Sequence, residues 1–365
     1  MSDLRYWLAL NSLPDIGPVF ARRLLSAFGS PETVFQMPVE ELKKVEGIGK
    51  QRLRAITGFR QWDALRRQID SAGARGIALV SLNDRAYPEG LRRIHDAPLI
   101  LYVRGELKDT DKYAVAMVGS RDATDYGMQA AEQIAGGLAL AGLTVVSGMA
   151  RGIDTAAHRG ALRAGGRTIA VLGSGVDVPY PATNRELAGD IESAGAVISE
   201  FPPGTPPGKE NFPRRNRIIS ALSFGTVVVE AALDSGSLIT VGYALEQGKE
   251  VFAVPGTITS RNSRGANDLI RKGAKLVECA GDVIEELRLQ LKGVLREGGP
   301  AAEKKLPPMT DDEQALYRCL DSKPKHIDVI IRETNMATGR AMSVLLDLEL
   351  KGIVRQLQGK QFTLN

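Results

Sequence analysis

Four polar residues with phosphate-binding chemistry follow one another within residues 211–220, and they are Arg214, Arg215, Asn216 and Arg217. The stretch follows a Pro/Gly-rich loop and precedes an apolar run, which predicts that it begins a helix. Helix N–H groups and the helix dipole favour anions there, and a guanidinium fork matches phosphate oxygens. The pattern therefore indicates phosphate binding. The alternative is an arginine-rich helix face paired with local carboxylates.

Four further turns combine glycines with hydroxyl or charged side chains, and each follows an apolar, β-prone run. Their candidate residues are Ser120 and Arg121; Ser147, Gly148 and Met149; Gly173 and Ser174; and Glu230 with Ser237. Glycines in such turns allow backbone N–H groups to approach a phosphate, and hydroxyls add donors. A single turn could be only a tight strand-to-helix corner. Taken together with the arginine-rich stretch, the turns predict an anion site.

The glycine turns match no nucleotide-binding fingerprint. None fits Gly-x-Gly-x-x-Gly with an acidic residue at the required distance, and Gly248-Lys249 is followed by Glu250 instead of the hydroxyl that a Walker A motif needs. The sequence therefore disfavours nicotinamide dinucleotides and ATP, and we predict no cofactor.

The candidate catalytic pairs are weak. Asp154 and His158 are four residues apart on an expected helix and could form a hydrogen bond, but no serine or cysteine in a nucleophile elbow lies nearby. Glu230 and Glu246 could form a carboxylate pair, whose separation a sequence does not give. We predict a binding protein that is not an enzyme and holds no metal.

Length and composition are those of an ordinary globular protein. The chain has 365 residues, which suggests two or three domains, and its net charge of +4 with a pI near 9.0 permits nucleic-acid binding without requiring it. Two distant cysteines argue against a disulfide framework and a zinc site. No signal-peptide core or membrane-spanning run is visible, so we expect a cytoplasmic protein without membrane attachment.

A doubly wound α/β domain is predicted for residues 76–292. Apolar runs that favour strands occur at 78–81, 99–103, 113–118, 143–146, 168–172, 196–199, 226–229, 251–254 and 275–277. From residue 113 onward, stretches of helical length lie between most of them, which indicates a mostly parallel sheet covered on both faces. Ligands of such sheets bind beyond the carboxyl ends of the strands, where the chain order reverses.

Smaller domains are predicted at both ends. Residues 1–75 are expected to be helical, with apolar residues at helical spacing in 6–10, 20–28 and 56–65 and with two glycine turns, 13–18 and 45–50. These turns resemble helix-hairpin-helix motifs, whose N–H groups contact DNA phosphates without reading sequence; the alternative is a helical scaffold without DNA contact.

The carboxyl-terminal part is predicted to be a linker, 293–309, followed by a winged helix, 310–365. Three helices are expected at 311–320, 327–333 and 338–350, and a hairpin at 353–364. The third helix would enter a major groove, but it contains Asp347 and Glu349 beside Arg340. We therefore favour a protein contact over a DNA contact for this domain.

The combined motifs resemble the DprA (Smf) family of DNA-processing proteins. The resemblance rests on Gly-Ser-Arg at 119–121, Ser-Gly-Met-Ala-Arg-Gly-Ile-Asp at 147–154, Tyr-Pro at 180–181, Glu-Phe-Pro-Pro-Gly at 200–204, Phe-Pro-Arg-Arg-Asn-Arg at 212–217 and Ser-Gly-Ser-Leu-Ile-Thr at 235–240. It spans over half the chain. It implies an extended Rossmann-like domain between a SAM- or helix-hairpin-helix-like domain and a winged helix.

The resemblance also implies a function. Proteins of this family bind single-stranded DNA, load RecA recombinase onto incoming strands in natural transformation, and form homodimers through the Rossmann-like domain. Carried over by motif, the DNA-binding residues would be Ser120, Arg121, Ser147, Gly148, Met149, Arg214, Arg215, Asn216, Arg217 and Ser237, with Lys249 as a weaker candidate. Single-strand binders usually stack bases on aromatic side chains, and only Phe212 and Tyr180 stand in suitable places.

Two other functions compete with this one. The doubly wound domain also resembles nucleotide-binding phosphoribohydrolases, but the glycine-rich turn of those enzymes is replaced here by residues 234–240, with Glu246 further on. A sequence-specific regulator that uses the winged helix is the other alternative, and the acidic residues of its third helix argue against it.

Overall fold

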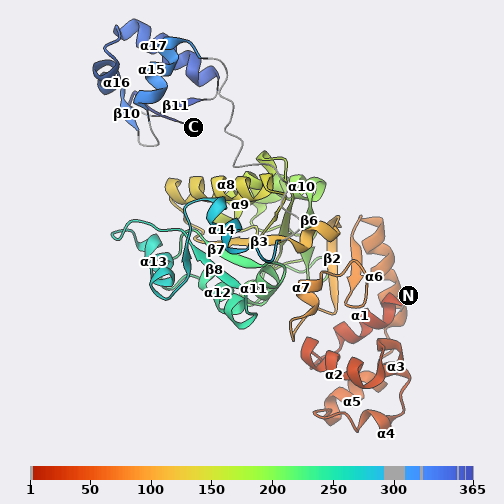
Figure 1. Ribbon diagram of the computed structural model, residues 1–365. Helices are drawn as coiled ribbons and strands as arrows, with labels where there is room; N and C mark the ends of the chain where they lie inside the picture. Colours follow the sequence, from red (N-terminus) through yellow and green to blue (C-terminus); the bar gives the residue numbers. More distant parts are fainter. Residues whose placement is uncertain (1–2, 292–308, 321–323, 352, 358, 365) are drawn as a thin grey trace. The chain divides into compact units, whose positions relative to one another are not determined.

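The computed structural model describes residues 3–291, 309–320, 324–351, 353–357 and 359–364 (Figure 1). The chain divides into two compact units, residues 1–296 and 297–365. Most of the expected linker, 293–309, lies outside the described residues. Within the described residues, no helix combines the length and apolar character needed to cross a membrane.

A nine-stranded sheet forms the centre of the first unit, in the order β1-β2-β6-β5-β4-β3-β7-β8-β9. Its strands are β1 (Ala78–Ser81), β2 (Ile100–Gly105), β3 (Ala114–Val118), β4 (Thr144–Ser147), β5 (Thr168–Val171), β6 (Ala196–Ser199), β7 (Gly225–Val228), β8 (Glu250–Ala253) and β9 (Lys275–Leu276). Only the β1–β2 and β2–β6 pairs are antiparallel. The predicted mostly parallel, doubly wound sheet is confirmed: every apolar run noted in the sequence overlaps one of these strands, and the other six strand pairs are parallel.

Helices cover both faces of the sheet (Figure 1). They are α8 (Asp125–Leu140), α9 (Ile153–Arg163), α10 (Arg185–Ala194), α11 (Asn211–Ala221), α12 (Ser237–Glu246), α13 (Arg264–Arg271) and α14 (Ala280–Glu286), with short 3-10 turns η1 (Asp109–Lys112), η2 (Ala182–Asn184) and η3 (Arg261–Ser263). Successive residues of a strand point to opposite faces. In β3, Val115 and Met117 join the core beneath α8 and α9, whereas Ala116 and Val118 join the core beneath α11 and α12.

The amino-terminal helices are α1 (Leu4–Ser12), α2 (Pro18–Phe28), α3 (Pro31–Gln36), α4 (Val39–Leu42), α5 (Lys50–Thr57) and α6 (Trp62–Ala74), and the short α7 (Glu89–Arg92) follows β1. The helical spacing noted over 56–65 spans two helices and not one. Helix α5 is capped by Gly58, and the rings of Phe59 and Trp62 pack edge to face, 4.9 Å apart, at the bend before α6. The apolar spacing is continuous through residues 56–65, but the chain bends there and the two aromatic rings pack at the bend.

The second unit has the predicted winged-helix elements. They are α15 (Asp311–Cys319), α16 (Ile327–Thr334) and α17 (Thr338–Leu350), with a small sheet of β10 (Lys325–His326), β11 (Val354–Leu357) and β12 (Gln361–Leu364). Its core is separate and contains Leu316, Ile330, Leu345 and Phe362. The short strand β10 was not anticipated, because two residues carry no periodic signal.

A buried histidine joins α9 to the sheet. The Thr168 hydroxyl donates to the Val145 carbonyl at 2.7 Å, so Nδ1–H of His158 donates to the Thr168 oxygen at 2.6 Å. Its Nε2 is buried and has no hydrogen-bond partner among the described residues. Burial, assisted by the charge of Arg215, lowers the pKa of His158 to about 3.

This histidine makes folding stability depend on pH. In the unfolded chain a histidine takes up a proton near pH 6.5, whereas His158 in the folded chain stays neutral to about pH 3. Stability is therefore fully present above pH 6.5 and is lost as the pH falls toward 3, by about 2 kcal/mol at pH 5. Urea unfolding of wild type and His158→Gln at pH 7 and pH 5 measures this loss.

We expect the loss between pH 7 and pH 5 to be about 2 kcal/mol smaller in His158→Gln than in wild type. His95→Gln is the control, because His95 is exposed. Identical pH dependence in wild type and His158→Gln would contradict the assignment of a buried, neutral imidazole.

Candidate nucleic-acid interface

The fold brings the predicted turns to one edge of the sheet. Strands β3, β4, β5 and β7 are parallel, so the residues that follow them lie at their common carboxyl edge. The start of α11 reaches the same edge after β6. The turn after β3 contains Ser120 and Arg121, the turn after β4 contains Gly148 and Met149, and Ser237 begins α12 after β7.

Arg215 points into the protein. Its side chain is 4% exposed and donates to the backbone carbonyls of Gly148, at 2.5 Å, and Val171, while its Nε donates to the side chain of Asn216 at 2.9 Å. Burial lowers the pKa of Arg215 to about 10, and the charge of Asp154 opposes that shift. The guanidinium thus remains charged at neutral pH and connects α11 to the exits of β4 and β5.

Gly148 is required by this arginine. A Cβ at Gly148 would lie 2.2 Å from a guanidinium nitrogen of Arg215, so the open space beside the glycine is filled from inside the protein. Ser147 is fully buried and donates to the carbonyl of Met117 at 2.6 Å. The glycine turn after β4 therefore serves internal packing in this structure, and Ser147 does not reach the surface.

Met149 has an unusual backbone. Its φ of 65° lies in the left-handed region, which methionine rarely adopts, while its side chain is buried in the core beneath α10. Asn184 holds this conformation by donating to the Met149 carbonyl at 2.9 Å. The strained residue stands directly at the strand exit, where such conformations are often functional.

Arg217 is also internal. Its guanidinium is bonded to both carboxylate oxygens of Glu200, at 3.1 and 2.8 Å, and its Nε donates to Asp96 at 2.9 Å. All of its charge is thus compensated by two carboxylates, and its side chain is 6% exposed. For this residue the structure agrees with the alternative of local ion pairing, and we do not propose it as a phosphate contact.

Three neighbouring side chains form a row at this edge, in which Arg121 and Tyr180 are exposed and Phe212 is half-buried between them. The guanidinium carbon of Arg121 lies 5.2 Å from the centre of the Phe212 ring, and that ring lies 5.7 Å from the ring of Tyr180. Tyr180 is 46% exposed. Gly173 makes room for the row, because a Cβ there would come within 2.9 Å of Phe212. We call Arg121, Phe212 and Tyr180 the aromatic row.

Further cations lie next to the row. Arg214 is exposed, and its guanidinium lies 5.2 Å from the Phe201 ring and 3.7 Å from a carboxylate oxygen of Glu200. Lys209, in the loop before α11, is exposed and was not predicted. Its position two residues before the start of α11 is the signal in the sequence that could have indicated it.

The remaining candidates at this edge have local partners. The side-chain oxygen of Asn216 accepts a hydrogen bond from Arg215, and its amide nitrogen donates to the Gly236 carbonyl at 3.5 Å. The backbone N–H of Ser120 donates to the Glu230 carbonyl, and the hydroxyl of Ser237 lies 2.8 Å from that of Ser235. The hydroxyls of Ser120 and Ser237 belong to partly exposed residues, so both could still donate to a ligand.

Lys249 lies at the opposite edge of the sheet. It directly precedes β8, so it stands at the amino end of the parallel strands, and its ammonium lies 6.0 Å from the Phe224 ring. Burial lowers its pKa, and the charge of Arg93 adds to that effect. The structure therefore does not bring Lys249 together with Arg121.

The candidate catalytic pairs do not assemble. Asp154 accepts from the Ala150 N–H at 3.2 Å, whereas His158 is bonded to Thr168. Glu230 is buried just after β7, at the carboxyl edge, and its carboxylate is bonded to Thr124, whereas Glu246 is exposed at the last residue of α12, shortly before the amino end of β8. Glu230 and Glu246 therefore do not form a carboxylate pair.

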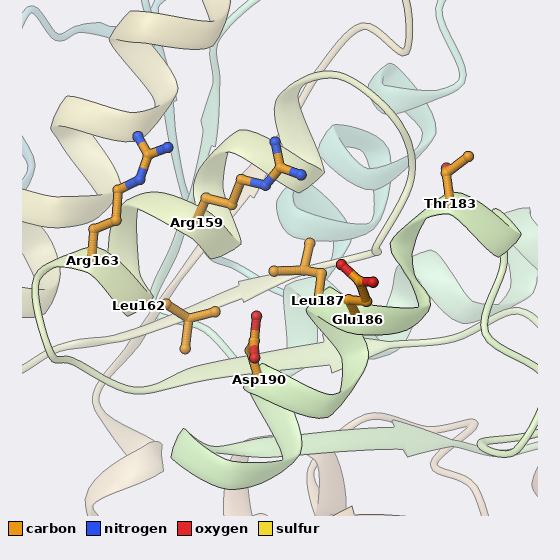
Figure 2. A pocket seen from close by; sticks show the side chains of 7 residues that line it. All are labelled: Arg159, Leu162, Arg163, Thr183, Glu186, Leu187 and Asp190. Carbon is orange, nitrogen blue, oxygen red and sulfur yellow. The ribbon is translucent and has the colours of Figure 1, made fainter.

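A hollow of about 270 Å³ lies between α9 and α10 (Figure 2). Its lining carries charges of both signs: Arg159 and Arg163 from α9, and Glu186 and Asp190 from α10. Arg163 is paired with Glu132. A mixed lining of this kind does not favour a phosphate, so we do not assign the anion site to this hollow.

The arginines of the amino-terminal hairpins mostly bind backbone carbonyls. Arg52 donates to the carbonyls of Asp15 and Gly47, at 2.8 and 2.7 Å, and Arg23 donates to that of Glu46 at 2.7 Å. Arg22 donates to the carbonyl of Ile94. These bonds hold the hairpins together and fit a scaffold; DNA contact by the hairpins stays a prediction.

The third helix of the winged helix has a weak basic character. Arg340 is bonded to Asp312, with both guanidinium contacts at 2.7 Å. Met342 and Leu346, one turn apart, are 41% and 56% exposed. An apolar face beside a neutralised arginine is unlike the polar surface that reads base edges.

Three protein-family models match three successive parts of the chain. The family model described as DNA recombination-mediator protein A matches residues 78–288, more than half of the chain. A model of the DprA winged helix domain matches residues 300–360, and one of a SAM-like helix-hairpin-helix tandem matches residues 8–57.

Individual relatives agree with these matches. Protein Smf of Synechocystis is 33% identical over 392 residues, which cover 99% of this chain and 98% of that protein. The structure of DNA processing protein A (DprA) from Streptococcus pneumoniae superposes with a TM-score of 0.68 and 36% identity, over 78% of this chain and 99% of that one. A structure concerned with the single-stranded DNA binding mode of DNA processing protein A from Helicobacter pylori has a TM-score of 0.53 and 31% identity, over 58% and 96% of the two chains.

Replacement of a buried, ion-paired arginine and of an exposed arginine should affect folding stability differently. Arg217→Ala removes both hydrogen bonds to the buried carboxylate of Glu200 and leaves Arg214, at 3.7 Å, beside it, so we expect a loss of about 3 kcal/mol of unfolding free energy. Arg121→Ala removes an exposed side chain, so its unfolding free energy should stay within about 0.5 kcal/mol of wild type. Urea unfolding at pH 7 measures both. Equal stability of the two variants would contradict the internal role of Arg217.

Proposed function

Because the chain belongs to the DNA recombination-mediator protein A family, the family of the DprA and Smf proteins, we propose that it binds single-stranded DNA without regard to sequence and mediates recombination. The observation that carries this proposal is the aromatic row at the carboxyl edge of the sheet. We propose that it acts by binding in the cytoplasm, without catalysis and without a cofactor.

The aromatic row suits a single strand better than a duplex. A single strand exposes the faces of its bases, and one base stacked on an aromatic ring contributes about 1–3 kcal/mol in any sequence. A duplex covers those faces. Tyr180 and Phe212 supply the rings in this proposal, and the Arg121 guanidinium, positioned over Phe212, supplies donors to the adjoining phosphate.

The path of the strand follows from the exposed cations. Arg121, Arg214 and Lys209 are the proposed phosphate contacts, and the hydroxyls of Ser120 and Ser237 could add donors beside them. Arg215, Asn216 and Arg217 keep an indirect role, because their bonds hold the start of α11 in place. Phosphate contacts carry no sequence information, which supports sequence-independent binding.

The recombination partner is RecA in this proposal, with loading onto incoming strands in natural transformation. Homodimerisation through the Rossmann-like domain is proposed with it, and the short edge strand β9 with exposed Leu276 supports it. Sedimentation equilibrium measures the dimer, and RecA filament assembly on a bound strand measures the loading. A monomer at micromolar concentration would contradict the proposed dimer. Unchanged RecA filament assembly would contradict the proposed loading.

Titration of fluorescent oligo-dT over a range of salt tests the aromatic row. Arg121→Ala should weaken binding and flatten the salt slope by about 0.7, the value for one phosphate contact on a single strand. Phe212→Ala should weaken binding by roughly tenfold or more while leaving the slope unchanged, because a stacking contact releases no counterion.

Lys112→Ala is the matched control. Lys112 is an exposed cation that lies 4.9 Å from the ring of Tyr113, but it precedes β3 and therefore lies at the amino edge. It should bind as wild type does. Equal affinity of wild type and both row variants would refute the proposed site, and equal binding of a duplex would refute the preference for single strands.

Removal of residues 309–365 separates the two DNA-binding alternatives. The truncated chain should keep oligo-dT affinity within about threefold of wild type, because the proposed contacts all lie in the first unit. Loss of all binding after truncation would instead favour a regulator that binds through its winged helix.

A further inference from the structure

The order of strands in the sheet marks the place, called the crevice below, where doubly wound sheets bind ligands. Strand β3 lies between β4 and β7, and the chain runs outward from it in both directions. Ligands of doubly wound sheets bind outside the carboxyl ends of the strands at this reversal point. A nucleotide phosphate would stand there against the first turn of the helix after β3, which is α8.

A carboxylate of the chain itself occupies that position. Oε2 of Glu230 accepts the backbone N–H of Thr124 at 2.9 Å, and Oε1 accepts the Thr124 hydroxyl at 2.6 Å. Thr124 is the N-cap of α8, and its hydroxyl also accepts the N–H of Gly127 at 3.2 Å. Glu230 is 2% exposed. The positive end of α8 is therefore already paired with an anion.

The fit of this carboxylate is close. A Cβ added at Gly127 would lie 2.5 Å from both the carboxyl carbon and Oε2 of Glu230. The backbone of Glu230 also holds the turn after β3, because its carbonyl accepts the N–H of Ser120 at 2.6 Å. One residue thus fills the space against α8 and fixes the turn from which Arg121 extends.

The other glycine turns at this edge are filled in the same way. The guanidinium of Arg215 packs on Gly148, and the ring of Phe212 packs on Gly173. Glu230 differs from both because it brings a negative charge to the place where a phosphate would bind. A second anion there would meet the charge of Glu230 and would find the space taken.

We propose that Glu230 is a specificity-determining residue that excludes the phosphate of a free nucleotide from the crevice. This inference rests on the proposed function, because the exclusion leaves the outer surface beside Arg121 to the backbone of a nucleic-acid strand. The protein can then hold a strand in the presence of cellular nucleotides that carry the same phosphate chemistry.

Removal of the carboxylate should open an anion site. We expect Glu230→Ala to bind AMP at least tenfold more tightly than wild type in calorimetric titrations, and to melt at a higher temperature in inorganic phosphate than in potassium chloride of equal ionic strength. Wild type should bind AMP more weakly and should show only the small increase in melting temperature that phosphate, as an excluded salt, gives to any folded protein. Loss of a residue with only a structural role would lower the melting temperature and would not make it respond to phosphate.

Gly127→Ala combined with Glu230→Ala is the matched control. The methyl group at position 127 would occupy the space that the carboxylate leaves, so the double variant should fold and lose the gain in AMP and phosphate binding. Gly127→Ala alone should destabilise the protein, because its Cβ would meet the carboxylate. The two substitutions together should therefore cost less than the sum of their separate effects.

Each outcome decides the inference. A folded Glu230→Ala variant that responds to phosphate and AMP as wild type does would overturn it, as would an equal response of the double variant and Glu230→Ala. If Glu230→Ala unfolds in chloride, refolding on addition of AMP at unchanged ionic strength supports the inference, because the phosphate of AMP then replaces the carboxylate. Failure to refold with AMP would overturn it.

The two proposals fail separately. Oligo-dT binding by wild type tests the proposed function, whereas the phosphate and AMP measurements use no DNA. A wild-type protein that binds no strand, beside a Glu230→Ala variant that gains phosphate binding, would remove only the proposed function. Strand binding without any gain in the variant would remove only the role of Glu230.

Discussion

The buried guanidinium of Arg215 is the interaction on which the carboxyl edge depends. It carries a positive charge to the point where β4 and β5 end, and there it donates to the carbonyls of Gly148 and Val171. Unpaired carbonyls at a buried edge would be costly, and an unpaired charge would cost more, so each compensates the other. Because Arg215 fixes α11 inward, helix geometry places Arg214 outside and Phe212 beside the neighbouring turn.

Internal groups occupy several of the places that the fold offers to a ligand. Arg215 packs on Gly148, Phe212 packs on Gly173, and the carboxylate of Glu230 caps α8. The edge that binds nucleotides in related architectures is therefore closed with side chains of both signs. What remains accessible is its outer surface, where a polymer can lie across several turns.

The strands and their exits could be predicted from the sequence, because buried parallel strands are continuous apolar runs and their carboxyl ends must share one edge. The direction of each arginine could not. Arg214, Arg215 and Arg217 have the same chemistry and adjacent positions, and only the tertiary placement of Glu200 and of the β4 and β5 carbonyls separates surface from interior. Lys249 illustrates a different limit: its charge suggests phosphate binding, but its place directly before β8 puts it at the amino edge, away from the strand exits.

An arginine-rich motif therefore indicates an anion site only when the donors of its guanidinium groups remain available. Arg217 donates to two carboxylates, and Arg52, in the amino-terminal hairpins, donates to backbone carbonyls. Arg121 is exposed, has no ion pair within the described part of the chain, and has its guanidinium carbon 5.2 Å from the centre of the Phe212 ring. A cation–π contact of this kind uses the charge of the guanidinium and does not use its N–H groups as hydrogen-bond donors. A guanidinium held in this way is ordered before a phosphate arrives, so binding loses less side-chain entropy than it would with a free arginine.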